Sequence, residues 1–328
     1  MNWSEKRVLV TGAGGFIGSH LTERLTERGA QVRALVRYNS RSSFGFLDYL
    51  SPALTSRVEI IQADLRDAEA VRNAIKDIEV VFHLGALISI PYSYVHPQEV
   101  VETNILGTLN VLNACRELRT ARIVHTSSSE VYGTALQVPI DEKHPLQGQS
   151  PYSASKIGAD MLAESFFRSY DLPVTVVRPF NTYGPRQSAR AAIPTIITQA
   201  LTGNQVLLGD VRPTRDLVYV EDTVAGFIRM AEVSETTGEI INLGTGQETS
   251  IEELVMKVGR LLQKDLTLIF DATRIRPQKS EVLRLLANAQ KAQRFGWVST
   301  VPLDEGLRRT IQWISESTNL YRPGRYTI

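Results

Sequence analysis

Residues Thr11–His20 read T-G-A-G-G-F-I-G-S-H, and they follow directly on the run R-V-L-V-T at Arg7–Thr11. The run predicts a buried strand, and the residues after Gly15 carry apolar side chains at helical spacing. Between them, Gly12 permits a tight turn, Gly15 lets a pyrophosphate approach the backbone, and Gly18 lets the helix pack on the strand. Glycines in this strand–turn–helix context predict a dinucleotide-binding unit.

The first half of the chain alternates short β-branched runs with amphipathic stretches. The further predicted strands are Gln31–Val36, Val58–Gln62, Val80–His83, Arg122–Thr126 and Val174–Arg178. The predicted helices are Gly15–Arg28, Ala68–Lys76, Pro97–Leu118 and Pro151–Tyr170. Strands and helices that alternate at this spacing form parallel βαβ units. The sequence therefore predicts an α/β protein with a doubly wound parallel sheet of the Rossmann type.

The pattern changes after the last of these strands. Residues 179–328 are punctuated by prolines and contain two more predicted helices, at Ile251–Leu262 and Leu303–Ser317. We expect residues 1–178 to form the dinucleotide-binding domain. Residues 179–328 are expected to form a smaller C-terminal α/β substrate lobe, partly interleaved with the first domain, so that the two pack around a cleft.

The composition argues against several classes of protein. The 328 residues carry 36 Lys and Arg against 35 Asp and Glu, a net charge of +1, which disfavours a nucleic-acid partner. Cys115 is the sole cysteine, which excludes a cysteine metal cluster, and the five histidines lack metal-ligand spacing. No apolar run is long enough to span a bilayer, and no signal-peptide core opens the chain. We therefore expect a cytoplasmic protein with no metal and no membrane partner.

The end of the second strand indicates the type of cofactor. An acid there would bind the ribose hydroxyls of NAD, but this strand ends in L-V-R at Arg37. Arg37 is suited to the 2′-phosphate of NADP, so we favour NADP over NAD, although the same residue is also compatible with an ordinary surface arginine. Asp64, after the third strand, stands where an adenine edge would be held or where the next helix would be capped.

A second motif, Y-S-A-S-K, places Tyr152 and Lys156 one turn apart on the same face of a helix. This spacing is common by chance, but a strand ending in T-S-S-S-E at Thr126–Glu130 precedes it. The carboxyl ends of parallel strands line the ligand crevice. We expect the Lys156 ammonium and a nicotinamide cation to lower the pKa of Tyr152 and make it a usable base.

These motifs, together with H-L-G-A at His83–Ala86 and S-S-S-E-V-Y-G at Ser127–Gly133, resemble the extended short-chain dehydrogenase/reductase family over essentially the whole chain. Within that family, Gly148–Asp160, Arg178–Arg190 and Arg215–Thr223 are similar to the N-acetylglucosamine 4,6-dehydratases of the legionaminic-acid type. The resemblance implies a nucleotide-sugar substrate, a tightly bound and recycled NAD(P), and a homodimer formed through a four-helix interface.

The resemblance also implies the catalytic roles. Tyr152, assisted by Ser128 and Lys156, would remove the carbon-4 hydroxyl proton while hydride passes to the nicotinamide. Glu130 would take the carbon-5 proton, water would leave from carbon 6, and hydride would return there. Ser129 stands where some members carry Asp as the acid for the leaving hydroxyl. Because serine is a poor acid, we expect Glu130 to act first as base and then as acid.

The remaining site residues are carried over from the same resemblance. The residues expected to hold the cofactor are Gly12, Gly15, Phe16, Ile17, Arg37, Asp64, Leu65, Leu84, Gly85, Ala86, Thr103, Tyr152, Lys156, Pro179 and Thr182. Those expected to contact the substrate are Ser128, Asn181, Arg215, Asn242 and Arg276. The two arginines among them suit a diphosphate, because a planar guanidinium pairs well with phosphate oxygens.

Two other functions share parts of this pattern. A nucleotide-sugar 4-epimerase or a UDP-glucuronate decarboxylase of the same family would use the same oxidation step, and decarboxylases carry a strand end similar to that around Glu130. A non-catalytic cofactor sensor would need neither Glu130 nor the pair Tyr152 and Lys156, so their presence argues against it. The sequence leaves open the nucleotide base and the choice between NAD and NADP.

Overall fold

The computed structural model describes residues 1–321, so residues 322–328 of the predicted second lobe lie outside the described part. Its centre is a seven-stranded sheet in the order β10-β6-β5-β4-β1-β2-β3, in which every neighbouring pair is parallel. The strands are β1 Arg7–Thr11, β2 Gln31–Val36, β3 Val58–Gln62, β4 Val80–His83, β5 Arg122–Thr126, β6 Val174–Pro179 and β10 Ile240–Leu243. This arrangement confirms the predicted doubly wound parallel sheet.

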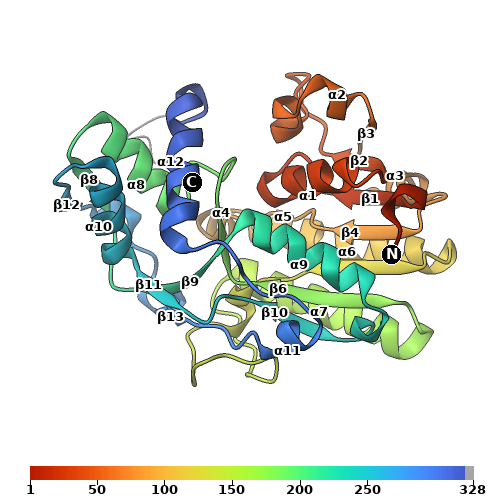
Figure 1. Ribbon diagram of the computed structural model, residues 1–328. Helices are drawn as coiled ribbons and strands as arrows, with labels where there is room; N and C mark the ends of the chain where they lie inside the picture. The colour runs from red at the N-terminus through yellow and green to blue at the C-terminus, as the bar shows by residue number, and fades with distance from the viewer. Residues whose placement is uncertain (322–328) are drawn as a thin grey trace.

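Helices cover both faces of this sheet (Figure 1). On one face α1 (Phe16–Glu27) contacts α9 (Val220–Glu232). On the other face α6 (Gly107–Glu117) packs between α3 (Ala68–Ile75) and α7 (Pro151–Tyr170).

The strand residues alternate between two apolar cores. Val8 and Val10 of β1 belong to the core that also contains Leu21 of α1, whereas Leu9 belongs to the core that contains Val111 of α6. Because both faces of the sheet are covered, its strands are continuous apolar runs rather than alternating ones. This is why the sequence pattern located them well.

The predicted helix 97–118 is one helical path in three parts. It comprises α5 (Pro97–Val101), a π-helical turn (Glu102–Leu106) and α6. The short helix α2 (Pro52–Thr55) precedes β3, and the short helix α4 (Ile90–Val95) follows β4. None of the helices within residues 1–321 has the length and apolar character needed to cross a bilayer.

Beyond residue 179, the described chain forms two small sheets and, apart from α9, three longer helices. The helices are α8 Ala192–Thr202, α10 Ile251–Leu262 and α12 Leu303–Glu316, with a short α11 at Gln290–Arg294. One sheet contains β7 Asn181–Tyr183, β9 Thr214–Tyr219, β11 Glu248–Ser250 and β13 Arg284–Leu285, and the other pairs β8 Gln205–Leu208 with β12 Thr267–Phe270. Strand β10 and helix α9 also come from beyond residue 179, yet they pack into the main sheet and onto it.

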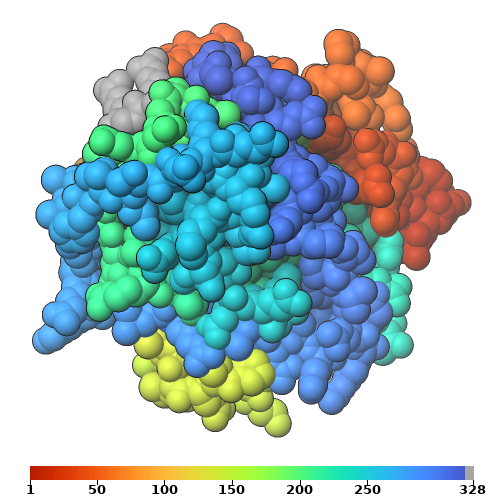
Figure 2. All heavy atoms as spheres, turned by 60° about the vertical axis from the view of Figure 1, so that its left-hand side comes forward, coloured from red at the N-terminus to blue at the C-terminus, as the bar shows by residue number. Residues whose placement is uncertain are grey.

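Contacts from α12 join the C-terminal part of the described chain to residues near the N-terminus. Figure 2 shows α12, in dark blue, between light-blue residues from the second half of the chain and orange residues from near its start. The ring of Trp313 lies 5.8 Å from that of Tyr49 and beneath the guanidinium of Arg186. Arg186 in turn forms an ion pair of 2.8 Å with Glu23 of α1.

Candidate active site

A cavity of about 620 Å³ lies at the carboxyl edge of the main sheet, and a smaller one of about 130 Å³ lies around the ends of β2 and β3. The larger cavity is lined by the glycine-rich turn, the end of β5, the first turn of α7 and the segment that joins β6 to β7. All the cofactor residues expected from the sequence, except Lys156, line one of these two cavities. Ser128, Ser129, Glu130 and Asn181 line the larger one as well.

The glycine-rich turn is shaped to receive a pyrophosphate. Gly12 has a φ of 69°, and a Cβ there would lie 2.8 Å from the Cα of Gly85. A Cβ on Gly18 would collide with the carbonyl oxygen of Gly12. Gly15, by contrast, is the N-cap of α1, has no capping side chain, and leaves the first N–H groups of the helix facing the cavity. Free N–H groups at a helix N-terminus bind anions, so these residues fit a dinucleotide.

A segment after β2 closes over this turn, and sequence reasoning did not identify it as part of the site. The N–H of Phe46 donates to the carbonyl oxygen of Gly14 at 2.9 Å. Gly45 has a φ of 70°, and a Cβ there would overlap the same carbonyl oxygen. Asn39, Ser43 and Phe44 of this segment line the larger cavity. The signal in the sequence that could have indicated this turn was Gly45, because backbone with a positive φ favours glycine.

The residues at the ends of β2 and β3 face the cofactor cavities but already have partners. The Nη2 atom of Arg37 lies 3.2 Å from Oε1 of Glu99, and its side chain is 60% exposed. Asp64 accepts two hydrogen bonds from the Arg66 guanidinium, which lower its pKa. The suggestion that Asp64 caps the following helix is wrong, because Asp67 accepts from the first N–H groups of α3.

Helix α7 begins with a reciprocal capping box between Ser150 and Ser153, and Pro151 occupies the first helical position. This start fixes the first turns of the helix, which place Tyr152 and Lys156 beside β5. Both side chains are buried, and Nζ of Lys156 donates to the carbonyl oxygen of the last residue of β5 at 2.5 Å.

Burial shifts the pKa values of both members of this pair in the protein without a bound cofactor. Burial raises the pKa of Tyr152 to about 12, against the opposing effect of a hydrogen bond with Ser128. Burial lowers the pKa of Lys156 to about 8. The predicted lowering of the tyrosine pKa is therefore absent in the protein alone, because the cost of burying a phenolate outweighs the stabilising groups nearby.

The end of β5 turns back over the cavity. Ser128 is the N-cap of a 3₁₀ turn at Ser129–Tyr132, and its hydroxyl accepts from the N–H of Glu130 at 3.2 Å. Ser129 is buried, and Glu130 is half-buried at the cavity wall. Burial lowers the pKa of Arg215, and the charge of Glu130 acts on it in the opposite direction. The Glu130 carboxylate is therefore close enough to both Tyr152 and Arg215, the arginine expected to contact substrate, to act on their pKa values.

The two expected diphosphate arginines converge on one carboxylate. Nη2 of Arg215 lies 3.4 Å from Oε1 of Glu281, and Nη1 of Arg276 lies 3.5 Å from the same oxygen. Arg276 and Glu281 line a further cavity of about 930 Å³. Asn181 lines the main cavity, and its buried Oδ1 atom has no hydrogen-bond partner within the described residues. These side chains remain compatible with a bound substrate.

Asn242 does not belong to this group, which corrects the expectation. It is fully buried in β10, where Oδ1 accepts from the Tyr132 hydroxyl at 2.7 Å and Nδ2 donates to the carbonyl oxygen of Ile140 at 3.1 Å. Its amide is therefore occupied by the core. The sequence pattern placed β10 in the second lobe and could not show that it joins the main sheet beside β6.

Comparison with known proteins supplies the family. The family described as GDP-mannose 4,6 dehydratase matches residues 9–310. The chain belongs to this family. It is 34% identical to UDP-glucose 4-epimerase from Mycolicibacterium smegmatis, over 94% of this chain and 98% of that protein. It is 32% identical to UDP-N-acetyl-alpha-D-glucosaminuronate decarboxylase from Bacillus cytotoxicus, over 96% and 99%.

A solved structure adds a third reaction. A double mutant of dTDP-glucose 4,6-dehydratase from Streptomyces venezuelae, with NAD bound, superimposes with a TM-score of 0.84 and 28% identity, over 96% of this chain and 98% of that one. This family of nucleotide-sugar enzymes therefore includes epimerases, decarboxylases and dehydratases at similar distance from this chain. The likeness confirms the α/β fold and an enzyme of this family, and it leaves the reaction to be argued from the site.

Proposed function

We propose that this protein is a nucleotide-sugar 4,6-dehydratase that acts on a nucleotide-linked N-acetylglucosamine. The observation that carries the proposal is that Glu130 lines the same cavity as Tyr152 and Ser128. Elimination of water from carbons 5 and 6 needs a base for the carbon-5 proton as well as a base for the carbon-4 hydroxyl. A 4-epimerase needs only the second of these bases.

The side chains then divide the proton transfers between them. Tyr152 takes the carbon-4 hydroxyl proton, with Ser128 holding the phenol oxygen and Lys156 supplying positive charge beside it. Glu130 takes the carbon-5 proton and returns a proton to the leaving carbon-6 hydroxyl. It serves both steps because the hydroxyl of Ser129 is too weak an acid to protonate the leaving group. Bound NAD(P) supplies reversible hydride transfer and a positive charge that stabilises the phenolate. The low solvent exposure of the pair limits loss of protons to water.

The glycine-rich turn and the two cofactor cavities support NAD(P) as the bound cofactor. We propose that residues 1–178 hold it and that residues 179–328 supply the substrate lobe. Arg37 stands at the end of β2, where the strand carries no acid, and this supports a preference for NADP over NAD. Arg215 and Arg276 would exchange Glu281 for the diphosphate, and Asn181 would contact the sugar.

A homodimer is part of the same proposal. The helical path 97–117 and helix α7 are neighbours, and they expose apolar side chains. These are Val101, Leu106, Met161 and Tyr170, each between 41% and 51% exposed. Pairing this surface with its copy would form the four-helix interface implied by the family resemblance. A single protomer mass in light scattering of the purified protein would contradict it.

The alternative is a 4-epimerase or a uronate decarboxylase, since relatives of both kinds match 94% and 96% of the chain at comparable identity. Mass spectrometry of the product separates the three reactions. A dehydratase yields a nucleotide sugar lighter by one water, a decarboxylase acts on a uronate and releases carbon dioxide, and an epimerase leaves the mass unchanged. We expect loss of water from UDP- or GDP-N-acetylglucosamine. An unchanged mass with both, together with turnover of a uronate, would overturn the proposal.

A further inference from the structure

We propose that Asp160 is a positioning residue of the active site. Its carboxylate holds helix α7 against the carboxyl end of β5 through Ser127 and against β6 through Arg178. The inference rests on the proposed function for the meaning of the activity it measures, but the contacts themselves do not depend on it.

The first contact joins the two elements that carry the reacting groups. Asp160 lies one helical turn beyond Lys156 on the same face of α7. Its Oδ2 atom accepts from the Ser127 hydroxyl at 2.7 Å. Ser127 stands between Thr126, whose carbonyl oxygen receives the Lys156 ammonium, and Ser128, whose hydroxyl bonds Tyr152. Together with the bond from Lys156 to Thr126, this hydrogen bond helps to fix the distance between Tyr152 and Lys156 on the helix and the Ser128 hydroxyl after the strand.

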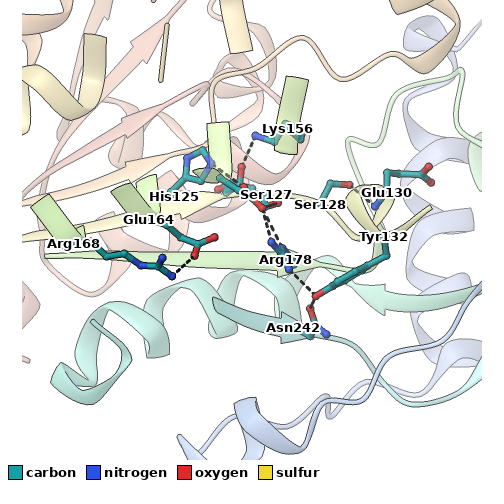
Figure 3. A network of polar contacts seen from close by, with 12 residues as sticks. His125, Ser127, Ser128, Glu130, Tyr132, Lys156, Glu164, Arg168, Arg178 and Asn242 are labelled. Atoms are coloured by element: carbon teal, nitrogen blue, oxygen red, sulfur yellow. Dashed lines mark hydrogen bonds and ion pairs between the residues drawn. The ribbon is translucent and has the colours of Figure 1, made fainter. Parts of the chain in front are cut away.

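The second contact extends to the turn that carries Glu130. Arg178 of β6 donates to Oδ2 of Asp160 from Nε at 3.1 Å and from Nη2 at 3.0 Å. Its Nη1 donates to the Tyr132 hydroxyl at 3.1 Å. Tyr132 ends the 3₁₀ turn that contains Glu130. Figure 3 shows Arg178 between Ser127 and Tyr132, with Lys156 and Ser128 above it.

This network is closed to solvent. Asp160 and Tyr132 are fully buried, and Arg178 is 1% exposed. The ring nitrogen Nε2 of His125 lies 3.3 Å from Oδ1 of Asp160, but burial lowers the pKa of His125 and so disfavours its charged form. The carboxylate thus faces two cations, Arg178 and Lys156, and removing its charge leaves both uncompensated. A purely packing role would not require a charge at this position.

The charge of Asp160 also gives the inference a distinctive readout. It raises the pKa of both Tyr152 and Lys156. The other charged groups that face this pair are Glu130, which also raises the tyrosine pKa, and Arg178, which faces Asp160. Burial lowers the pKa values of His83 and His125 and so disfavours the charged forms of these rings. Removing the Asp160 charge therefore lowers the pKa of both members of the pair.

The test compares Asp160→Asn with Glu164→Gln, each in the full-length protein. Glu164 lies one turn further along α7 and pairs with the exposed Arg168, at 3.1 Å, away from the cavities (Figure 3). Asp160→Asn is expected to lower kcat by about 10²-fold, since small misplacements of reacting groups have effects of this size. It should change KM for the nucleotide sugar little and move both limbs of the pH–rate profile to lower pH by about one unit. Equal kcat and an unshifted profile in the two variants would overturn the proposal.

Two further measurements cover the cases in which this comparison fails. If Asp160→Asn does not fold, Ser127→Ala removes only the strand contact and should still lower kcat by about tenfold; a kcat equal to that of Glu164→Gln would overturn the proposal. If the wild-type protein turns over no nucleotide sugar, the proposed function fails separately. Amide hydrogen exchange of residues 126–132 then decides, because Asp160→Asn or Ser127→Ala should accelerate it and Glu164→Gln should not.

Discussion

Lys156 donates from Nζ to the carbonyl oxygen of Thr126 at 2.5 Å, which fastens helix α7 to the last residue of β5. The contact is buried, and its ammonium has a pKa of about 8 because burial disfavours the charge. A lysine held in this way supplies a positive charge next to Tyr152 at neutral pH and begins to lose it just above. The positive charge of Lys156, which the proposed reaction uses, therefore lies where burial makes it destabilise the folded protein.

This arrangement predicts that Lys156→Met does not destabilise the cofactor-free protein at pH 7. The difference between the ordinary pKa of 10.5 and about 8 corresponds to about 3 kcal/mol. The folded protein is destabilised by this amount at pH values where the Lys156 side chain is charged. The unfolded state binds the extra proton between these pH values, so the wild-type stability rises with pH there. The variant should equal or exceed the wild type at pH 7, and its advantage should shrink above pH 8.

Urea unfolding at several pH values measures this difference. Activity should be lost in the variant although the fold is retained. A free energy of unfolding at pH 7 that is lower than that of the wild type by more than about 1 kcal/mol would show that the hydrogen bond to Thr126 outweighs the cost of the buried charge.

Tyr152→Phe should abolish turnover without loss of cofactor. Removing a general base lowers kcat by about 10²–10⁴-fold. The ring itself is retained, so the shape of the cavity wall is preserved. Product formation and cofactor fluorescence measure the two effects. The matched control is Tyr170→Phe at the end of the same helix, where the ring is 51% exposed. Turnover within tenfold of this control would remove Tyr152 from its assigned role.

Glu130→Gln should separate oxidation from elimination. The amide cannot take the carbon-5 proton, so the reaction should stop after carbon 4 is oxidised and reduced cofactor should accumulate. Absorbance of the reduced nicotinamide follows this directly, and the dehydrated product should fall by about 10²-fold or more. Glu164→Gln serves as the control. Unchanged product formation in Glu130→Gln would mean that another group removes the proton.

Arg37→Ser should weaken NADP binding more than NAD binding. A hydrogen bond from a charged group to phosphate contributes about 1.5–3 kcal/mol, or about 10- to 100-fold in Kd, and NAD lacks that phosphate. Titrations of the cofactor-free protein with NADP and NAD give both constants. Arg41→Ser in the same exposed segment is the control. A wild-type protein that binds NAD more tightly, with no effect of Arg37→Ser, would contradict the preference.

Local patterns predicted most of the fold because the main elements are marked by local chemistry. The buried parallel strands are continuous apolar runs, so β1 to β5 have the predicted bounds, and β6 is one residue longer. Helix α7 starts where Ser150 and Pro151 indicate. The helix over 97–118 was predicted as uniform, and the π-helical turn at Glu102–Leu106 left no signal in its periodicity.

Contacts between distant residues could not be predicted in the same way. Asn242 resembled a substrate-contacting residue, but its strand joins the main sheet and its amide bonds Tyr132, which is 110 positions away. Arg178 and Asp160 belonged to recognised motifs, yet their pairing depends on how β6 packs under α7. The segment around Gly45 lacked apolar periodicity and became visible as part of the site only through its contact with Gly14.

The central claim is that Glu130 takes a proton from carbon 5 of a nucleotide-linked N-acetylglucosamine. Proton NMR of the purified protein with UDP- and GDP-N-acetylglucosamine in deuterated water tests it most directly. We predict a new methyl signal from carbon 6, with deuterium at carbon 5, for one of the two nucleotides. An unchanged spectrum with both substrates, from protein shown to hold its cofactor, would contradict the claim.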